Sequence, residues 1–196
     1  KSGKLWIAVY GLGLVSFDPA TEAARLYSAD ESELGGEGAW ALAAAPDGVL
    51  WIATWGGGLV KFNPRDQSFV RYTSSDGLSG IPSDNLYEVV IDRRDPAILW
   101  IGTREAGLVR FDTKTETSQV FRSVPRRPET ISHDDVLSIY QSEDGILWIG
   151  TDGGGLNRFD DRSGRFERFA DNVGIANGTI YGVIGDSRGV LWMSTN

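Results

Sequence analysis

The chain has 196 residues, of which 41% are hydrophobic and 23% are charged, and it carries a net charge of −8 without any basic tract. An acidic chain of this kind lacks the electrostatic surface that binds DNA or RNA, and anionic membrane surfaces would repel it. It has no Cys, which excludes disulfides, Cys-ligated zinc and thiol chemistry, and no apolar run approaches the roughly 18 residues that span a bilayer.

The dipeptide Leu-Trp recurs five times and marks an internal repeat. The Trp residues of successive copies lie 45, 49, 48 and 44 positions apart. A period in the forties with several short strands per unit is typical of β-propeller blades. The 25 Gly and the 11% aromatic residues suit the turns and strands of an all-β chain. The units begin near Leu5, Leu50, Leu99, Leu147 and Leu191.

Each complete unit is predicted to hold four strands separated by turns, as the fourth unit shows best. Its mostly apolar first strand is followed by the turn Asp144-Gly145 and then by the nearly continuous apolar Leu-Trp strand. A third strand and an exposed outer strand complete a four-stranded antiparallel meander, the unit of a propeller blade. In this unit the strands are expected at residues 136–140, 146–151, 156–159 and 165–169.

The other units repeat this order along the chain. Their first strands are expected at residues 40–45, 86–91 and 180–184, and their outer strands at residues 24–27, 69–72 and 118–121. The longest and most polar segments connect one unit to the next, at about residues 28–39, 73–85, 122–135 and 170–179.

The sequence starts and stops at a second strand. It therefore predicts three complete blades, a first blade without its innermost strand and a last blade with two strands. Because propellers usually close with four to eight blades, we expect residues 1–196 to form a single segment of a larger propeller. The alternative is that the four periods close as a small ring. Open blade faces would drive self-association.

The repeated phrase resembles the two-component regulator propeller repeat. It consists of Leu-Trp-Ile-Gly-Thr, a Gly-rich turn and Gly-Leu-x-x-Phe-Asp, and it is clearest at residues 147–160, 99–112 and 50–63. The first unit departs from it at Ala8 and Val9. The resemblance implies the extracytoplasmic, periplasmic sensing region of a bacterial membrane receptor, such as a hybrid histidine kinase or a diguanylate cyclase. The rest of that receptor would be a partner, and a glycan or another nutrient would be the ligand.

Most of the repeated aromatic and Gly residues are predicted to be structural. The five Leu-Trp tryptophans occupy one repeat position, where a large ring fills the space between blades. Phe17, Phe62, Phe111 and Phe159 are equivalent to one another in the same way. The runs starting at Gly56 and Gly153 lack the Gly-Lys-Ser/Thr ending of a phosphate-binding loop, so they are predicted to be tight turns.

One repeat position combines a constant frame with a changing side chain. Directly after the Thr, or after Val9 in the first unit, this position holds Tyr10, Trp55, Arg104 and Asp152, with Glu105 added in the third unit. The turn lies on the face of the long blade-to-blade connections, where propellers usually bind ligands. Aromatic faces accept the C–H side of a sugar and charged groups accept its hydroxyls, so these five residues are the predicted ligand site. Ordinary turn variability is the alternative.

The remaining candidates are weaker. His133 beside Asp134 and Asp135 has the side chains of a general base or metal site, but a lone His is weak evidence and the carboxylates are expected to cap the loop. Neither Asp134-Asp135 nor Asp160-Asp161 has calcium-loop spacing. The Arg126-Arg127 loop is predicted to be solvated, with an anionic sugar as the alternative partner. No catalytic residue, metal or cofactor is predicted.

Three functions remain open on this evidence. The first is a sensory module that binds a small polar ligand or oligosaccharide on its loop face. The second is a non-catalytic protein–protein interaction scaffold, since a fold alone does not set function. The third is a propeller lyase or glycan-cleaving enzyme, which would need a placed acid–base pair. The first two functions can be distinguished by the positions of three side chains. A binding module should bring Tyr10, Trp55 and Arg104 together in one pocket, whereas a scaffold should scatter them over a flat face.

Overall fold

The computed structural model describes residues 3–28, 34–77, 80–169 and 178–195. Over these residues the chain forms seventeen β-strands. The described ranges contain no helix long and apolar enough to cross a membrane. Residues 29–33 and 170–177, which belong to two of the predicted blade-to-blade connections, lie outside the described part.

The strands form five antiparallel sheets that follow one another in chain order. The first contains β1 (Leu5–Val9), β2 (Gly13–Asp18) and β3 (Ala23–Ser28). The second contains β4 (Ala39–Ala44), β5 (Leu50–Thr54), β6 (Leu59–Asn63) and β7 (Ser68–Tyr72). The third contains β8 (Leu86–Ile91), β9 (Ile98–Thr103), β10 (Leu108–Asp112) and β11 (Thr117–Phe121). The fourth contains β12 (Val136–Gln141), β13 (Leu147–Thr151), β14 (Gly155–Asp160) and β15 (Arg165–Arg168), and the fifth contains β16 (Ile180–Gly185) and β17 (Leu191–Thr195).

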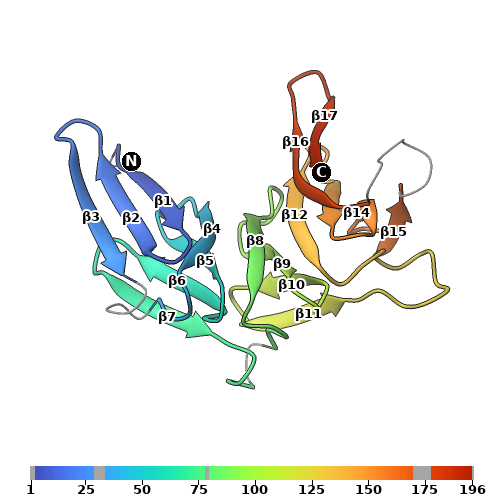
Figure 1. The fold of residues 1–196 in the computed structure, drawn as a ribbon, viewed down its shortest axis with the longest axis horizontal. Coiled ribbons are helices and arrows are strands. Elements are labelled where there is room, and N and C mark those ends of the chain that lie inside the picture. Colours follow the sequence, from blue (N-terminus) through green and yellow to red (C-terminus); the bar gives the residue numbers. More distant parts are fainter. Residues whose placement is uncertain (1–2, 29–33, 78–79, 170–177, 196) are drawn as a thin grey trace.

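The five sheets are arranged as successive blades around an open arc (Figure 1). The first strands β4, β8, β12 and β16 contact one another in sequence along the inner side of the arc. The predicted all-β fold is confirmed, with three four-stranded blades, a three-stranded first blade and a two-stranded last blade. Predicted strand ends agree with the observed ones to within about one residue, as expected for a strongly periodic sequence.

The repeated Thr closes the turn between the second and third strands of each complete blade. Thr54, Thr103 and Thr151 are fully buried. Their hydroxyls donate hydrogen bonds to the carbonyls of Gly58, Gly107 and Gly155, at or directly before the start of the third strands, at 2.7, 2.7 and 2.9 Å. One of these residues, Gly107, has a φ of 85°, and a Cβ there would stand 2.1 Å from the Phe121 carbonyl. The motif thus sets the turn that carries the predicted site residues.

The core lies between adjacent sheets, where the first three Leu-Trp tryptophans each contact a Phe of the following blade. Trp51 packs edge-on against Phe111 with ring centroids 6.1 Å apart, and Trp100 packs in the same way against Phe159 at 5.6 Å. Both Trp rings are buried, as predicted.

The prediction that all five Leu-Trp tryptophans are core is wrong for Trp192, which is 55% exposed. No described sheet follows the fifth one to cover this ring. Trp148 is only half-buried, because the fifth blade has two strands and therefore offers no equivalent of Phe159. Trp6 is half-buried as well. The two buried rings, Trp51 and Trp100, lie in complete blades that are followed by complete blades, whereas Trp6 lies in the three-stranded first blade and Trp148 precedes the two-stranded last one.

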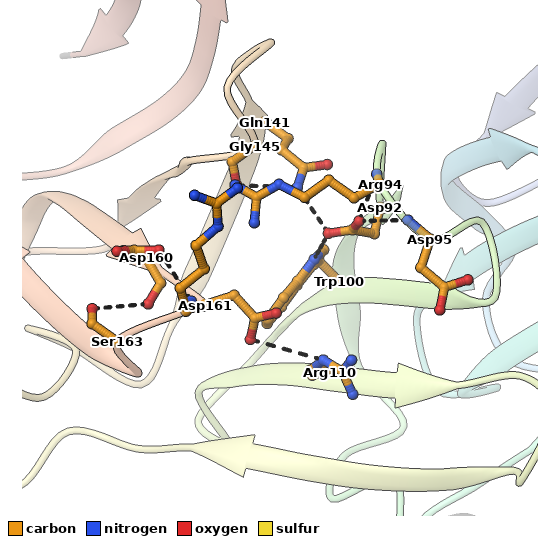
Figure 2. Close-up of polar contacts among 11 residues, drawn as sticks. Asp92, Arg94, Asp95, Trp100, Arg110, Gln141, Gly145, Asp160, Asp161 and Ser163 are labelled. Atoms are coloured by element: carbon orange, nitrogen blue, oxygen red, sulfur yellow. Dashed lines mark hydrogen bonds and ion pairs between the residues drawn. The ribbon is translucent and has the colours of Figure 1, made fainter.

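A buried carboxylate joins the third and fourth blades (Figure 2). Asp92 Oδ2 accepts a hydrogen bond from Trp100 Nε1 at 2.9 Å and another from Gln141 Nε2 of the next blade at 2.8 Å. Gln141 Oε1 in turn accepts the backbone N–H of Arg93. Tyr87 lies near the beginning of β8, whereas Asp92 directly follows its other end. This junction therefore lies away from the predicted ligand face.

Candidate functional site

Each first strand of the last four sheets contains a β-bulge at its second residue. The register shifts between Ala39 and Ala41 in β4, and it shifts at the equivalent place in β8, β12 and β16. A bulge leaves one residue unpaired and re-aims its side chain. The residues at this position are Trp40, Tyr87, Leu137 and Tyr181. Trp40 is 43% exposed and Tyr181 is 53% exposed, although both lie in apolar strands.

The predicted turn residues are held against the beginning of these strands. The backbone N–H of Trp55 donates to the Gly38 carbonyl at 3.3 Å, and that of Arg104 donates to the Asn85 carbonyl at 3.0 Å. The same turns also bond to the next blade, since the Gly56 N–H donates to the Asp84 carbonyl at 2.9 Å. The predicted position of these turns beside the blade-to-blade connections is therefore confirmed, and backbone contacts hold each turn residue near the bulge residue of the next blade.

Four aromatic rings meet at this face, and we call Tyr10, Trp40, Trp55 and Tyr87 the aromatic cluster. The ring centroid of Trp40 lies 5.1 Å from that of Tyr10, 5.5 Å from that of Trp55 and 5.7 Å from that of Tyr87. Trp55 and Tyr87 are 5.4 Å apart. The cluster draws on three successive blades, and Tyr10 and Trp40 are exposed.

Sequence reasoning found two of these four rings and missed the other two. Trp40 and Tyr87 lie in apolar strands, where side-chain alternation assigns large rings to the core. The signal that identifies them is their shared repeat position, whose occupants differ from blade to blade. Comparing the second residue of each first strand would have revealed it.

Arg104 extends the aromatic cluster on its charged side. Its guanidinium carbon lies 5.3 Å from the centroid of the Trp55 ring, within the range of a cation–π contact. Its Nε is 3.5 Å from Glu105 Oε1, in a solvent-exposed ion pair. Glu105 has a φ of 60°, and its backbone N–H donates to the Asp135 carboxylate. The structure therefore brings Trp55, Arg104 and Glu105 together.

Asp152, the last predicted site residue, lies in the same turn of the fourth blade. Its Oδ1 accepts a hydrogen bond from the Thr179 hydroxyl at 2.8 Å. We call Arg104, Glu105, Asp135 and Asp152 the charged rim. Burial raises the pKa of the Tyr87 phenol, and the charges of Asp135, Asp152 and Glu105 raise this pKa further, while Arg104 opposes them. The charged rim is thus close enough to the aromatic cluster to act on it electrostatically.

A carboxylate also borders the other end of the aromatic cluster. Tyr10 Oη donates a hydrogen bond to Glu37 Oε2 at 2.8 Å, and the Glu37 N–H donates to the Trp55 carbonyl at 2.7 Å. This hydrogen bond raises the pKa of the exposed Tyr10, with smaller contributions from burial and from the charge of Glu37.

The weaker sequence candidates organise loops. His133 Nδ1 accepts the Asp135 N–H at 3.0 Å, and Asp134 Oδ1 accepts the Ser123 N–H at 2.6 Å. Asp160 Oδ1 accepts the Arg162 N–H, and Asp161 lies 3.9 Å from the Arg110 guanidinium. Arg126 lies in the loop after β11 with a φ of 64°. Over the described ranges, no group of three or more His, Asp or Glu side chains is arranged to hold a metal ion.

Glu88, next to Tyr87, is a carboxyl group that the sequence reasoning did not single out. It pairs with Gly102, whereas the equivalent residues of the other first strands are Ala41, Ser138 and Gly182. Burial raises its pKa to about 7, and a hydrogen bond from the Val89 N–H opposes this rise only in part. A carboxyl group therefore occupies a position that takes small residues elsewhere.

A groove of about 1350 Å³ lies between the first and second sheets, and its lining includes Trp6, Ser16, Arg25 and Ala44. Equivalents of Ser16 are larger, and one of them, Lys61, lies over the Trp51 ring at 5.6 Å. Small side chains thus open this junction. None of the five predicted ligand residues lines the groove.

Residues 130–153 match the family model described as the two component regulator propeller. The match covers the first strand and the Leu-Trp strand of the fourth unit, and it confirms that the chain carries this repeat. No curated protein sequence matches the chain.

Several solved structures share the fold. One is the extracellular domain of a protein assigned to a hybrid two component system of B. thetaiotaomicron, with a TM-score of 0.73 over 99% of this chain at 19% identity. Another, assigned to a one component system of the same organism, has a TM-score of 0.77 over 100% of this chain at 19% identity. Virginiamycin B lyase from Staphylococcus aureus has a TM-score of 0.73 over 97% of this chain at 13% identity.

These likenesses show a β-propeller fold. The chain spans 31% of the hybrid system domain, 25% of the one component system domain and 59% of the lyase. It therefore corresponds to a segment of a larger propeller, as the repeat count predicts.

Proposed function

We propose that this chain is the ligand-sensing propeller region of a bacterial signal-transduction receptor, and that its loop face binds a small polar ligand or an oligosaccharide. The observation that carries the proposal is the aromatic cluster, in which rings from three blades form one continuous surface beside the charged rim. Tyr10, Trp55 and Arg104 belong to one connected group, which is the arrangement expected of a binding site.

The chemistry of the cluster suits a saccharide. A ring face of Trp or Tyr accepts the C–H side of a sugar through dispersion and removes that side from water. The neighbouring carboxylates and the guanidinium can then bind the hydroxyls, and such charge-assisted hydrogen bonds are stronger than neutral ones. Because these groups bind a ligand without changing its bonds, we propose a non-catalytic role.

The receptor context is also a proposal. It is supported by the two component regulator propeller repeat at residues 130–153 and by the fold shared with extracellular domains of B. thetaiotaomicron. On this proposal the chain lies in the periplasm, and the rest of its own receptor is its partner. An interaction scaffold is the second candidate, favoured by the apolar side chains exposed on the first and last sheets.

The test is a tryptophan fluorescence titration of the chain against a panel of neutral, amino-bearing and acidic saccharides. We expect a saturable change for at least one class. Trp55→Ala should weaken that binding by about tenfold to a hundredfold, since removing a central aromatic contact typically costs about 1.5–3 kcal/mol.

Trp192→Ala is the matched control, because it removes an exposed Trp outside the aromatic cluster and should leave the affinity unchanged. Retention of full affinity in Trp55→Ala, or the absence of saturable binding to every saccharide class, would contradict the proposed function and favour the scaffold.

A further inference from the structure

We propose that the aromatic cluster and the charged rim select saccharides that are uncharged or carry amino groups, and that they reject saccharides bearing carboxylate or sulfate groups. This inference rests on the proposed function and names the ligand class of the same site. It depends on which charges surround the rings and on how each charge is engaged.

Among the residues that the structure describes, carboxylates outnumber cations around the aromatic cluster. Glu37 borders it beside Tyr10, and three further carboxylates belong to the charged rim. Arg104 is the guanidinium of the charged rim, and Arg122 approaches the same turn through a hydrogen bond from Nη1 to the Glu105 carbonyl at 3.4 Å. A saccharide on the exposed rings would thus meet more negative than positive charge.

The electrostatic effect of the charged rim reaches the rings themselves. Asp135, Asp152 and Glu105 each disfavour a negative charge on the Tyr87 phenol, and Arg104 alone favours it. An anionic group of a ligand placed beside Tyr87 would experience the same unfavourable field. The whole chain adds to this field, because its net charge is −8.

The one cation of the charged rim is already engaged. Arg104 lies over the Trp55 ring and forms an ion pair with Glu105. Glu105 therefore offsets part of the positive charge that an anionic saccharide would meet at this guanidinium. An ammonium group, by contrast, is attracted both by the ring faces and by the carboxylates. The present contacts therefore favour neutral and amino-bearing ligands.

The expected selectivity is moderate because these charges are exposed. Glu105 retains 76% of its side-chain exposure, so salt screens its interactions. At low ionic strength we expect an acidic saccharide to bind at least about fivefold more weakly than a neutral one of the same linkage, with the difference shrinking toward 1 M salt.

The first measurement needs no ligand. Iodide, caesium and acrylamide serve as anionic, cationic and neutral quenchers of the chain's tryptophan fluorescence. Subtracting the fluorescence of the double variant Trp40→Phe/Trp55→Phe from that of the wild type isolates the emission of the two Trp rings in the aromatic cluster. At low salt, and with the quenching by each ion divided by its quenching of free N-acetyltryptophanamide, caesium should quench the two rings more strongly than iodide. Glu105→Gln/Asp152→Asn should reduce this preference, and Arg104→Gln should increase it.

The second measurement compares binding of β-1,4-linked oligosaccharides of glucose, glucosamine and glucuronate, which share linkage and differ in charge, within the broader panel. We expect the glucuronate series to bind most weakly and to gain affinity in Glu105→Gln/Asp152→Asn. Tighter binding of acidic than of neutral saccharides, or equal quenching by iodide and caesium, would overturn the charge selectivity alone. If no panel member binds in a manner that depends on Trp40 and Trp55, the proposed function itself fails.

Discussion

Asp92 shows how much one side chain contributes to the contact between blades. Its carboxylate accepts hydrogen bonds from Trp100 and Gln141, both of which are buried. Asp92→Ala leaves these two donors without a partner, so we expect it to lower the free energy of unfolding by about 2–4 kcal/mol. Urea denaturation at pH 7 measures this. Asp161→Asn, which alters an exposed pair with Arg110 in the same junction, should change stability by less than about 1 kcal/mol.

The contribution of Asp92 also has a pH signature. Burial raises the pKa of Asp92, but hydrogen bonds from Trp100, Gln141 and two backbone N–H groups together hold it below its ordinary value. A lowered native pKa stabilises the fold above roughly pH 4, and this stabilisation is lost as the pH falls through the native pKa. The stability difference between wild type and Asp92→Asn should therefore narrow in acid. A difference that stays constant down to pH 3 would contradict this account.

Glu88 should have the opposite effect on stability from Asp92, lowering it as the pH rises. Burial raises its pKa from 4.5 to about 7, so the native state holds a proton that the unfolded chain has released at intermediate pH. Stability should then fall as the pH rises from about 4.5 to 7, by at most about 3 kcal/mol. Glu88→Gln should remove this decrease, whereas the exposed control Glu143→Gln should keep it. The measurement is the urea midpoint at pH 5 and at pH 7.5.

The candidate site is only partly predictable from the sequence because its residues occupy two kinds of position. Trp55 and Arg104 lie in a turn, where the frame recurs and the side chain changes, so comparing repeats brings them out. Trp40 and Tyr87 lie in strands whose apolar pattern assigns them to the core. The bulge that exposes this position arises from how two strands pair, and no single residue type marks it, so only a comparison of the second residue of each first strand points to it.

At the scale of elements, the turns between second and third strands depend on Gly for two separable reasons. Gly107 has a φ of 85° and a Cβ there would meet the Phe121 carbonyl, whereas Gly153 has a φ of 81° with nothing within 4 Å. Gly153→Ala should therefore cost about 1 kcal/mol for the backbone conformation alone. Gly107→Ala should cost at least about 3 kcal/mol, because the strand behind it must also move. Equal losses in urea denaturation would contradict the steric explanation.

Strand order was predictable because several local signals agree in every unit. Gly-containing turns, the Leu-Trp strand and the Gly-Leu-x-x-Phe strand follow one another at nearly constant spacing. The burial of each Trp was less predictable, because it depends on how complete both its own blade and the next blade are. Trp100 is buried by Phe159 of the following blade, while Trp192 has no such neighbour in the described structure.

At the scale of the whole molecule, the open arc leaves the faces of its end sheets uncovered. Leu5, Ile7 and Leu26 are 53%, 44% and 45% exposed on the first sheet. Ile184 and Trp192 are 65% and 55% exposed on the last. The equivalents of Leu5 and Ile7 are buried in all three complete blades, so the uncovered end faces present apolar surface that favours association.

We therefore expect the 196-residue chain to self-associate through these faces. Ile7→Glu combined with Ile184→Glu should shift light scattering toward the monomer mass at equal protein concentration. Val70→Glu, which changes an exposed apolar residue on an outer strand, is the control and should leave the mass unchanged. A wild-type chain that stays monomeric at high concentration would contradict the expectation.

The bulge at the second residue of each first strand has a consequence for how such chains diversify. Side chains at the remaining positions of a strand alternate strictly between the two faces of the sheet. The bulge residue is exempt from this alternation because it has no paired partner. Trp40, Tyr87, Leu137 and Tyr181 can therefore be exchanged without repacking the interior. If the proposed function holds, a duplicated gene can thus acquire a new ligand preference through a few codon changes at these four places, while the scaffold beneath them stays unchanged.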